Sequence, residues 1–138
     1  MIELLGLSLL SIDDVSVIPE RLIQRLDGCA CPVDMVREYI DSPNIQNMVF
    51  TDDDDKIRGF LSVSFNVHND SIYINFMSVD DEYCGNGMTE HIWLLADIFK
   101  DTPAKKIFFH TLRPDDFERG GIKRSDQVYM EYEIKDKD

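Results

Sequence analysis

The sequence lacks any hydrophobic run long enough to cross a membrane. A spanning helix needs about 18 or more consecutive apolar residues, whereas the apolar stretch at residues 2–10 is short and is followed by Asp13 and Asp14. That stretch also has no basic segment before it, which a secretory signal would carry. We therefore expect residues 2–10 to form a strand, with no membrane partner and a cytoplasmic location.

Basic residues are few, since 14 Lys and Arg face 27 Asp and Glu and leave a net charge of −13. Proteins that bind nucleic acid need a basic surface to displace counterions from phosphates, so we expect no nucleic-acid partner. An acidic surface favours cationic partners, either an amine substrate or a basic protein face. A DNA-mimicking decoy is a weaker hypothesis, because no predicted helix carries a regular row of carboxylates.

Cysteine is scarce, and the odd number formed by Cys29, Cys31 and Cys84 argues against a disulfide framework. No second close pair and no histidine lies at ligand spacing from Cys29 and Cys31, so we predict no metal site. The acidic run at residues 52–55 lacks the spacing of a calcium loop and is interpreted as a hairpin turn.

The hydrophobic pattern that is present indicates one domain over residues 1–138, since 43% of the residues are hydrophobic. Apolar residues at helical spacing predict two early helices, which begin near Pro19 and Pro32 and end near Gly28 and before residues 42–44. The further prediction comprises strands at 45–51, 56–67, 71–79, 105–110 and 127–134, and helices at 88–99 and 115–119. The predicted order is β-α-α-β-β-β-α-β-α-β.

The strand at residues 71–79 has apolar residues on both of its predicted faces, which is typical of a central strand. Strict alternation predicts these two faces: Ile72, Ile74 and Phe76 on one, and Tyr73, Asn75, Met77 and Val79 on the other.

The segment at residues 79–89 carries the clearest chemical signal. Gly85 and Gly87 lie between a predicted strand and a predicted helix. Residues without a Cβ let the backbone approach an anion, and a helix N-terminus offers unpaired N–H groups and positive potential. This combination indicates a phosphate cradle.

On this segment, together with residues 54–60 and 117–122, the chain resembles the GNAT N-acetyltransferases. The resemblance implies an α+β fold with a mixed, mostly antiparallel central sheet flanked by helices. It also implies transfer of an acetyl group from acetyl-CoA to an amine. The residues that would bind the coenzyme are Val79, Gly85, Asn86, Gly87, Met88 and Thr89.

Three positions depart from the family pattern. Cys84 stands where the family has Arg or Gln, and Thr89 stands where it has Gly or Ala, so a phosphate donor is lost and a branched side chain could crowd the phosphates. Phe117 matches the family's tyrosine acid, yet it has no proton to give. Since proton transfer contributes about 10²–10⁴-fold, its loss would slow acyl transfer without abolishing a reaction driven by proximity.

Other catalytic candidates are Glu82, as a base beside the loop, and His110, as an acceptor of the amine proton. A solvated turn residue and a structural histidine are the competing interpretations. Cys84 beside a helix start is a further candidate, as a nucleophile of lowered pKa.

Two functions remain open. One is an active N-acyltransferase, in which a backbone N–H near Val79 polarises the thioester carbonyl. The other is an inactive binding or structural module, similar to compact phage versions of this fold, which would place it in a host cytoplasm or a virion.

Overall fold

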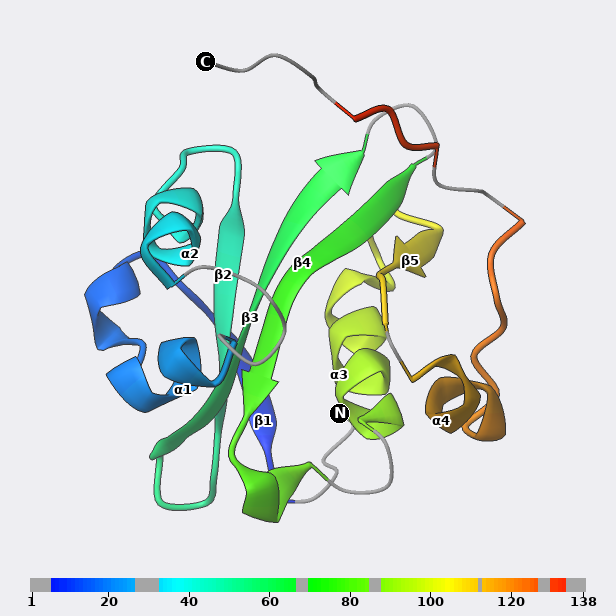
Figure 1. Cartoon of the computed structure of the whole chain (residues 1–138). Coiled ribbons are helices and arrows are strands. Elements are labelled where there is room, and N and C mark those ends of the chain that lie inside the picture. The colour runs from blue at the N-terminus through cyan, green and yellow to red at the C-terminus, as the bar shows by residue number, and fades with distance from the viewer. Residues whose placement is uncertain are drawn as a thin grey trace.

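The chain is described by a computed structural model over residues 6–26, 33–66, 70–84, 88–111, 113–126 and 130–133. It forms a five-stranded sheet with helices on both faces (Figure 1). The strands are β1 (Ser8–Ile12), β2 (Gln46–Thr51), β3 (Ile57–Asn66), β4 (Ser71–Val79) and β5 (Lys106–Phe108). The helices are α1 (Glu20–Gln24), α2 (Val33–Ile40), α3 (Thr89–Phe99) and α4 (Pro114–Arg119), with 3₁₀ turns η1 (Val15–Val17) and η3 (Asp81–Tyr83).

The strands lie in the order β1-β2-β3-β4-β5. Neighbours are antiparallel from β1 to β4, whereas β5 runs parallel to β4. This arrangement confirms the predicted α+β class and the mostly antiparallel sheet. The pairing of β5 involves only Ser71, Ile72 and Tyr73 of β4. Within the described residues, the rest of that edge of β4 therefore has no strand partner.

A β-bulge divides β4 into two halves. Val63 of β3 lies opposite Ile74, but the adjacent Ser62 lies opposite Phe76, so Asn75 is an extra residue in β4. An extra residue shifts the alternation of all later side chains by one position. The prediction that Phe76 shares a face with Ile72 and Ile74 is wrong for this reason.

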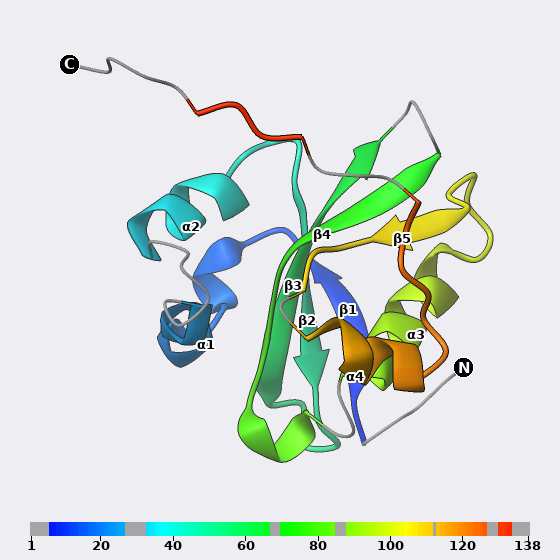
Figure 2. The ribbon, with the colours of Figure 1, turned by 45° about the vertical axis from the view of Figure 1, so that its right-hand side comes forward.

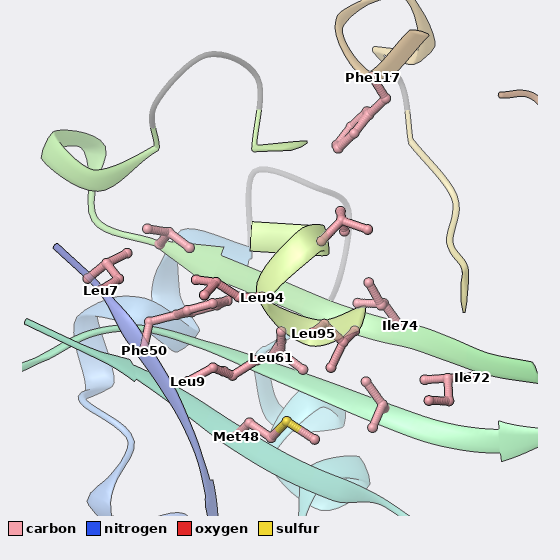
Figure 3. Packing of buried hydrophobic residues seen from close by; sticks show 13 residues of the cluster. Leu7, Leu9, Met48, Phe50, Leu61, Ile72, Ile74, Leu94, Leu95 and Phe117 are labelled. Carbon is pink, nitrogen blue, oxygen red and sulfur yellow. The ribbon is translucent and has the colours of Figure 1, made fainter. Parts of the chain in front are cut away.

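Two hydrophobic cores pack on opposite faces of the sheet. Leu61, Ile74 and Leu95 belong to the core under α3, and Phe117 reaches this core from α4 (Figure 3). Leu22, Val36 and Phe60 belong to the other core, under α1 and α2, and Phe76 packs against it. Figure 2 shows α1 and α2 on one side of the sheet and α3 and α4 on the other. The bulge is what sends Met77 and Val79 to the α3 side.

Most predicted elements are confirmed, including β4 over the predicted residues and both early helices. The first strand ends at Ile12 instead of residue 10, and residues 2–5 lie outside the described part. The final strand at 127–134 is wrong where it is described, because residues 130–133 are not in a strand. Met130 and Tyr132 there are 87% and 86% exposed, which shows that alternation without a partner strand does not make a strand.

Across the described ranges, no helix is long and apolar enough to span a membrane, and no group of three His, Cys, Asp or Glu residues could hold a metal. Cys29 and Cys31, which carried the sequence argument about metal, lie outside those ranges, as does the predicted helix end at Gly28.

Candidate functional site

A cavity of about 840 Å³ opens at the C-terminal end of β4. Its walls come from the end of α1, from β4 at Met77, Ser78 and Val79, from the first turn of α3, and from α4. The cavity therefore lies beside the part of β4 that β5 does not pair. A ligand in the cavity would contact the N-terminus of α3 together with residues of α1 and α4.

Three of the predicted coenzyme-binding residues, Val79, Met88 and Thr89, line this cavity together. Met88 has a left-handed backbone, with φ of 69°, directly before the first residue of α3. Gly85, Asn86 and Gly87 lie outside the described residues. Their role in a phosphate cradle stays a prediction.

Thr89, the first residue of α3, is only 3% exposed and packs against Gly120 at the end of α4. A Cβ built on Gly120 would lie 2.3 Å from the Thr89 Oγ1 and 2.6 Å from its Cγ2. Glycine at position 120 thus provides the room that the branched side chain needs. The Thr89 hydroxyl is buried without a hydrogen-bond partner among the described residues.

The first turn of α3 holds an unusual concentration of unpaired polar atoms. Thr89 Oγ1, Glu90 Oε2 and His91 Nδ1 belong to consecutive residues, and each is buried without a partner in the described structure. Buried polar side-chain atoms are normally hydrogen-bonded, so each exception needs an explanation. Thr89 and Glu90 also line the cavity as residues, so this part of α3 lies beside the candidate ligand site.

His91 is fully buried and fixes the segment that leads into the cavity. Its Nε2 donates to the carbonyl of Tyr83 in η3 at 2.8 Å, so the neutral ring carries its proton on Nε2. Burial lowers the pKa of His91 because the imidazolium would lose its hydration. The ring also packs edge-on against Phe50, with centroids 5.1 Å apart. These contacts hold η3 against α3.

Cys84 lines the cavity, but its thiol is not activated. Its Sγ lies 3.7 Å from the carbonyl oxygen of Val79 and 3.5 Å from that of Asp80. Burial is the main cause that raises the pKa of the thiol. The hypothesis of a nucleophile with lowered pKa is therefore wrong.

The two predicted catalytic residues lie apart from the cavity lining. Glu82 is an exposed residue of η3. His110 follows β5, where its Nδ1 contacts the Tyr73 hydroxyl and the ring centroids are 5.5 Å apart. Tyr73 pairs with Phe108, the last pair between β4 and β5, so His110 marks the point where these strands separate. The structure does not bring Glu82 and His110 together, and their catalytic roles stay predictions.

Phe117 lies in α4, where the family resemblance places a tyrosine acid. Its side chain, labelled in Figure 3, is only 9% exposed. It packs against Phe109, with ring centroids 4.7 Å apart. The residue therefore completes the α3-side core and offers no proton to the cavity.

Sequence reasoning missed the three arginines of the cavity, Arg25, Arg113 and Arg119. A signal for two of them exists in the sequence, because Arg113 precedes a short predicted helix and Arg119 ends it, in a chain that has few basic residues. The position of Arg25 depends on how α1 packs against the end of β4, which the local pattern does not encode.

The fold is similar to that of several solved acetyltransferases. One is ribosomal-protein-alanine N-acetyltransferase from Brucella melitensis biovar Abortus 2308, at 16% identity and a TM-score of 0.66, covering 93% of this chain and 99% of that one. A second is an aminoglycoside acetyltransferase from an uncultured soil metagenomic sample, at 15% identity and a TM-score of 0.61, covering 94% and 97%.

A third is glucosamine-6-phosphate N-acetyltransferase from Arabidopsis thaliana, at 16% identity and a TM-score of 0.60, covering 91% of this chain and 97% of that one. No protein-family model and no curated protein sequence matches the chain. Sequence identity at this level shows the fold alone. The chain therefore has the acetyltransferase fold of the GNAT superfamily, which its sequence resembles.

Proposed function

We propose that this protein is an acyl-CoA-dependent N-acetyltransferase. The observation that supports this most is the cavity at the end of β4, which is lined by the first turn of α3 together with Arg25, Arg113 and Arg119. The residues fit a phosphorylated coenzyme, because a threonine hydroxyl and a helix N-terminus both donate to phosphate oxygens. When bound, acetyl-CoA would supply the activated acetyl thioester.

Val79 and Met77 would position the pantetheine arm along the open edge of β4, since both line the cavity. The acceptor would be an amine, for which the acidic surface provides attraction. His110 is the candidate base, because it follows the last pairing of β4 with β5 and its ring is oriented by Tyr73. With phenylalanine at position 117, the departing thiolate would take its proton from water.

Calorimetric titration of acetyl-CoA and CoA into the purified chain tests the proposal, followed by a thiol-release assay over a panel of primary amines. We expect saturable coenzyme binding with a dissociation constant within the usual range of about 1 µM to 1 mM for enzyme substrates. His110→Gln should lower kcat while leaving coenzyme affinity unchanged. No binding of either coenzyme would refute the proposed function.

An inactive module is the second candidate, and it is favoured by two observations. Phe117 is buried in the core and Cys84 has a raised pKa, so neither offers proton transfer or nucleophilic chemistry at the cavity. This candidate predicts a stable complex with a basic protein and no thiol release with any amine. Turnover with any amine in the panel would exclude it.

A further inference from the structure

The cavity at the end of β4 is lined by three arginines, Arg25, Arg113 and Arg119, although the whole chain has 14 basic and 27 acidic residues. Asp81, Glu90 and Asp116 also line it, so the formal charge of the lining is balanced, in a chain whose net charge is −13. Arg113 precedes α4 and Arg119 ends it, so both reach the cavity from the same short helix. This concentration has no evident role in folding, because both side chains are largely exposed, at 77% and 73%.

The two α4 arginines share a single carboxylate within the described residues. Arg119 contacts Asp116 directly, and the Arg113 Nε lies 3.9 Å from the other oxygen of that residue. Each guanidinium carries five N–H donors, so most of their donors have no protein acceptor among the described residues. Arg25 differs, because it is paired at 2.7 Å with Asp81.

A second observation points to an anion at the same place. Thr89 is 3% exposed and is one of the residues that line the cavity, and its hydroxyl, which lies beside Gly120, has no partner in the described structure. It belongs to the first residue of an 11-residue helix, whose N-terminal amides also lack partners within the helix. Guanidinium groups, a hydroxyl and helix amides are the donors that proteins use for phosphate.

Three carboxylates in the lining oppose an anion, those of Asp81, Glu90 and Asp116. Asp81 and Asp116 are paired with arginines, whereas no ion pair of Glu90 is found among the described residues. Attraction to Arg113 and Arg119 must therefore outweigh repulsion from Glu90, and each arginine is expected to contribute to the affinity.

We propose that Arg113 and Arg119, at the two ends of α4, bind phosphate groups of the coenzyme. They would replace the phosphate donor that is missing at Cys84, in the connection between β4 and α3. The inference rests on the proposed function for the identity of the ligand. The chemistry that it names, a phosphate or diphosphate, comes from the arginine pair and the Thr89 hydroxyl.

Calorimetric titration of CoA into the wild type, Arg113→Gln, Arg119→Gln and the double variant tests the proposal. We expect each single variant to bind CoA about tenfold more weakly, and the double variant about a hundredfold, as for lost charge-assisted hydrogen bonds. Arg124→Gln is the matched control, because Arg124 is paired with Glu118 and Asp115 and is not among the cavity-lining residues described. It should bind CoA like the wild type.

Dephospho-CoA, which lacks the 3′-phosphate, shows which phosphate of the coenzyme the arginines bind. If the arginine variants lose the same affinity for dephospho-CoA, the pair binds the diphosphate; if they lose none, it binds the 3′-phosphate. Wild-type affinity for CoA in both single variants, or an equal loss in Arg124→Gln, would overturn the proposal.

Inorganic pyrophosphate separates this inference from the proposed function. If the wild type binds no CoA but binds pyrophosphate, and the double variant does not, the acetyltransferase proposal fails and the anion site stands. If the wild type binds neither ligand, both fail. Thermal unfolding of every variant shows that the fold is intact, which we expect because the substituted side chains are exposed.

Discussion

Polar groups at the C-terminal end of β4 are hydrogen-bonded on the side that faces α1 (the α1 flank) and unpaired on the side that faces α3 (the α3 flank). On the α1 flank, Arg21 donates to both oxygens of Asp80, at 3.0 and 2.8 Å, and to the carbonyl of Ile57 at 2.7 Å. On the same flank, the buried Ser78 hydroxyl donates to the carbonyl of Leu22 at 2.7 Å. On the α3 flank, the polar atoms of Thr89 and Glu90 stay buried and unpaired among the described residues.

The difference separates groups that stabilise the fold from groups that are available to a ligand. A paired buried group contributes to stability, whereas an unpaired one costs about 1–3 kcal/mol of desolvation until a partner arrives. The α1 flank should therefore respond to mutation through the free energy of unfolding. On the α3 flank, the charged side chains that line the cavity should respond mainly through the affinity for a ligand, whereas the packing contacts there still support the fold.

The largest effect that we expect comes from closing the space that α4 leaves for Thr89. Gly120→Ala should lower the free energy of unfolding by about 1–3 kcal/mol, because its Cβ overlaps the Thr89 side chain. Urea denaturation measures the change. Adding Thr89→Ala should restore part of the loss, since it removes the two nearest atoms. Full stability of Gly120→Ala would show that α4 does not rest on α3.

The second prediction concerns the ion pair between Arg21 and Asp80 on the α1 flank. Asp80→Asn should lower the free energy of unfolding by about 1 kcal/mol, a modest value because Arg21 is half exposed. Asp81→Asn is the control, and we expect a change below about 0.5 kcal/mol because Asp81 is 87% exposed. Equal losses in both variants would contradict the special role of Asp80.

The pH dependence of this pair has a definite sign. The hydrogen bond from Arg21 lowers the pKa of Asp80 below 3.8, so the stabilisation is present above about pH 4 and is lost as the pH falls through the lower folded-state pKa. The difference in stability between the wild type and Asp80→Asn should therefore disappear in strong acid.

The third prediction concerns His91, where burial lowers the pKa below 6.5. The unfolded chain binds a proton near pH 6.5 and the folded chain does not, so stability is complete above that pH and falls below it. The slope should not exceed about 1.4 kcal/mol per pH unit. Urea titrations between about pH 7.5 and 5.5, on either side of the ordinary histidine pKa, should show this slope reduced in His91→Gln. An unchanged slope in His91→Gln would contradict the assignment to His91.

The smallest effect that we expect concerns the affinity of the α3 flank for a ligand. Glu90→Gln should tighten CoA binding about threefold, because it removes a negative charge from the cavity wall. Asp97→Asn, on the same helix but paired with Lys100, should leave the affinity unchanged. Weaker binding by Glu90→Gln would mean that its carboxylate accepts a hydrogen bond from the ligand.

Local patterns in the sequence predicted the elements well but not their connections. The bounds of β4 follow from the turn residues before it and the change of pattern after it, which is why they are confirmed. The bulge at Asn75 has no such signature, because it depends on the register with β3. The pairing of Arg21 with Asp80 joins residues 59 positions apart, and only the packing of α1 reveals it.

The candidate site was predicted in part. Val79, Met88 and Thr89, which were predicted from the strand and helix on either side of the glycines, line one cavity, and their binding of the coenzyme stays a prediction. The arginines of α4 were missed because a family resemblance directs attention to matching positions, and Arg113 and Arg119 match none. The same resemblance placed Phe117 at an acid position, whereas its apolar side chain belongs to the core.

The extra residue at Asn75 determines which face of the sheet each later side chain of β4 points to. Deleting one residue there would exchange the destinations of every later side chain, sending Phe76 and Ser78 towards α3 and Met77 and Val79 towards α1. The same deletion in the exposed turn at residues 53–55 would shorten a loop and leave both cores as they are. Insertions and deletions in related chains should therefore accumulate in that turn and be excluded from β4.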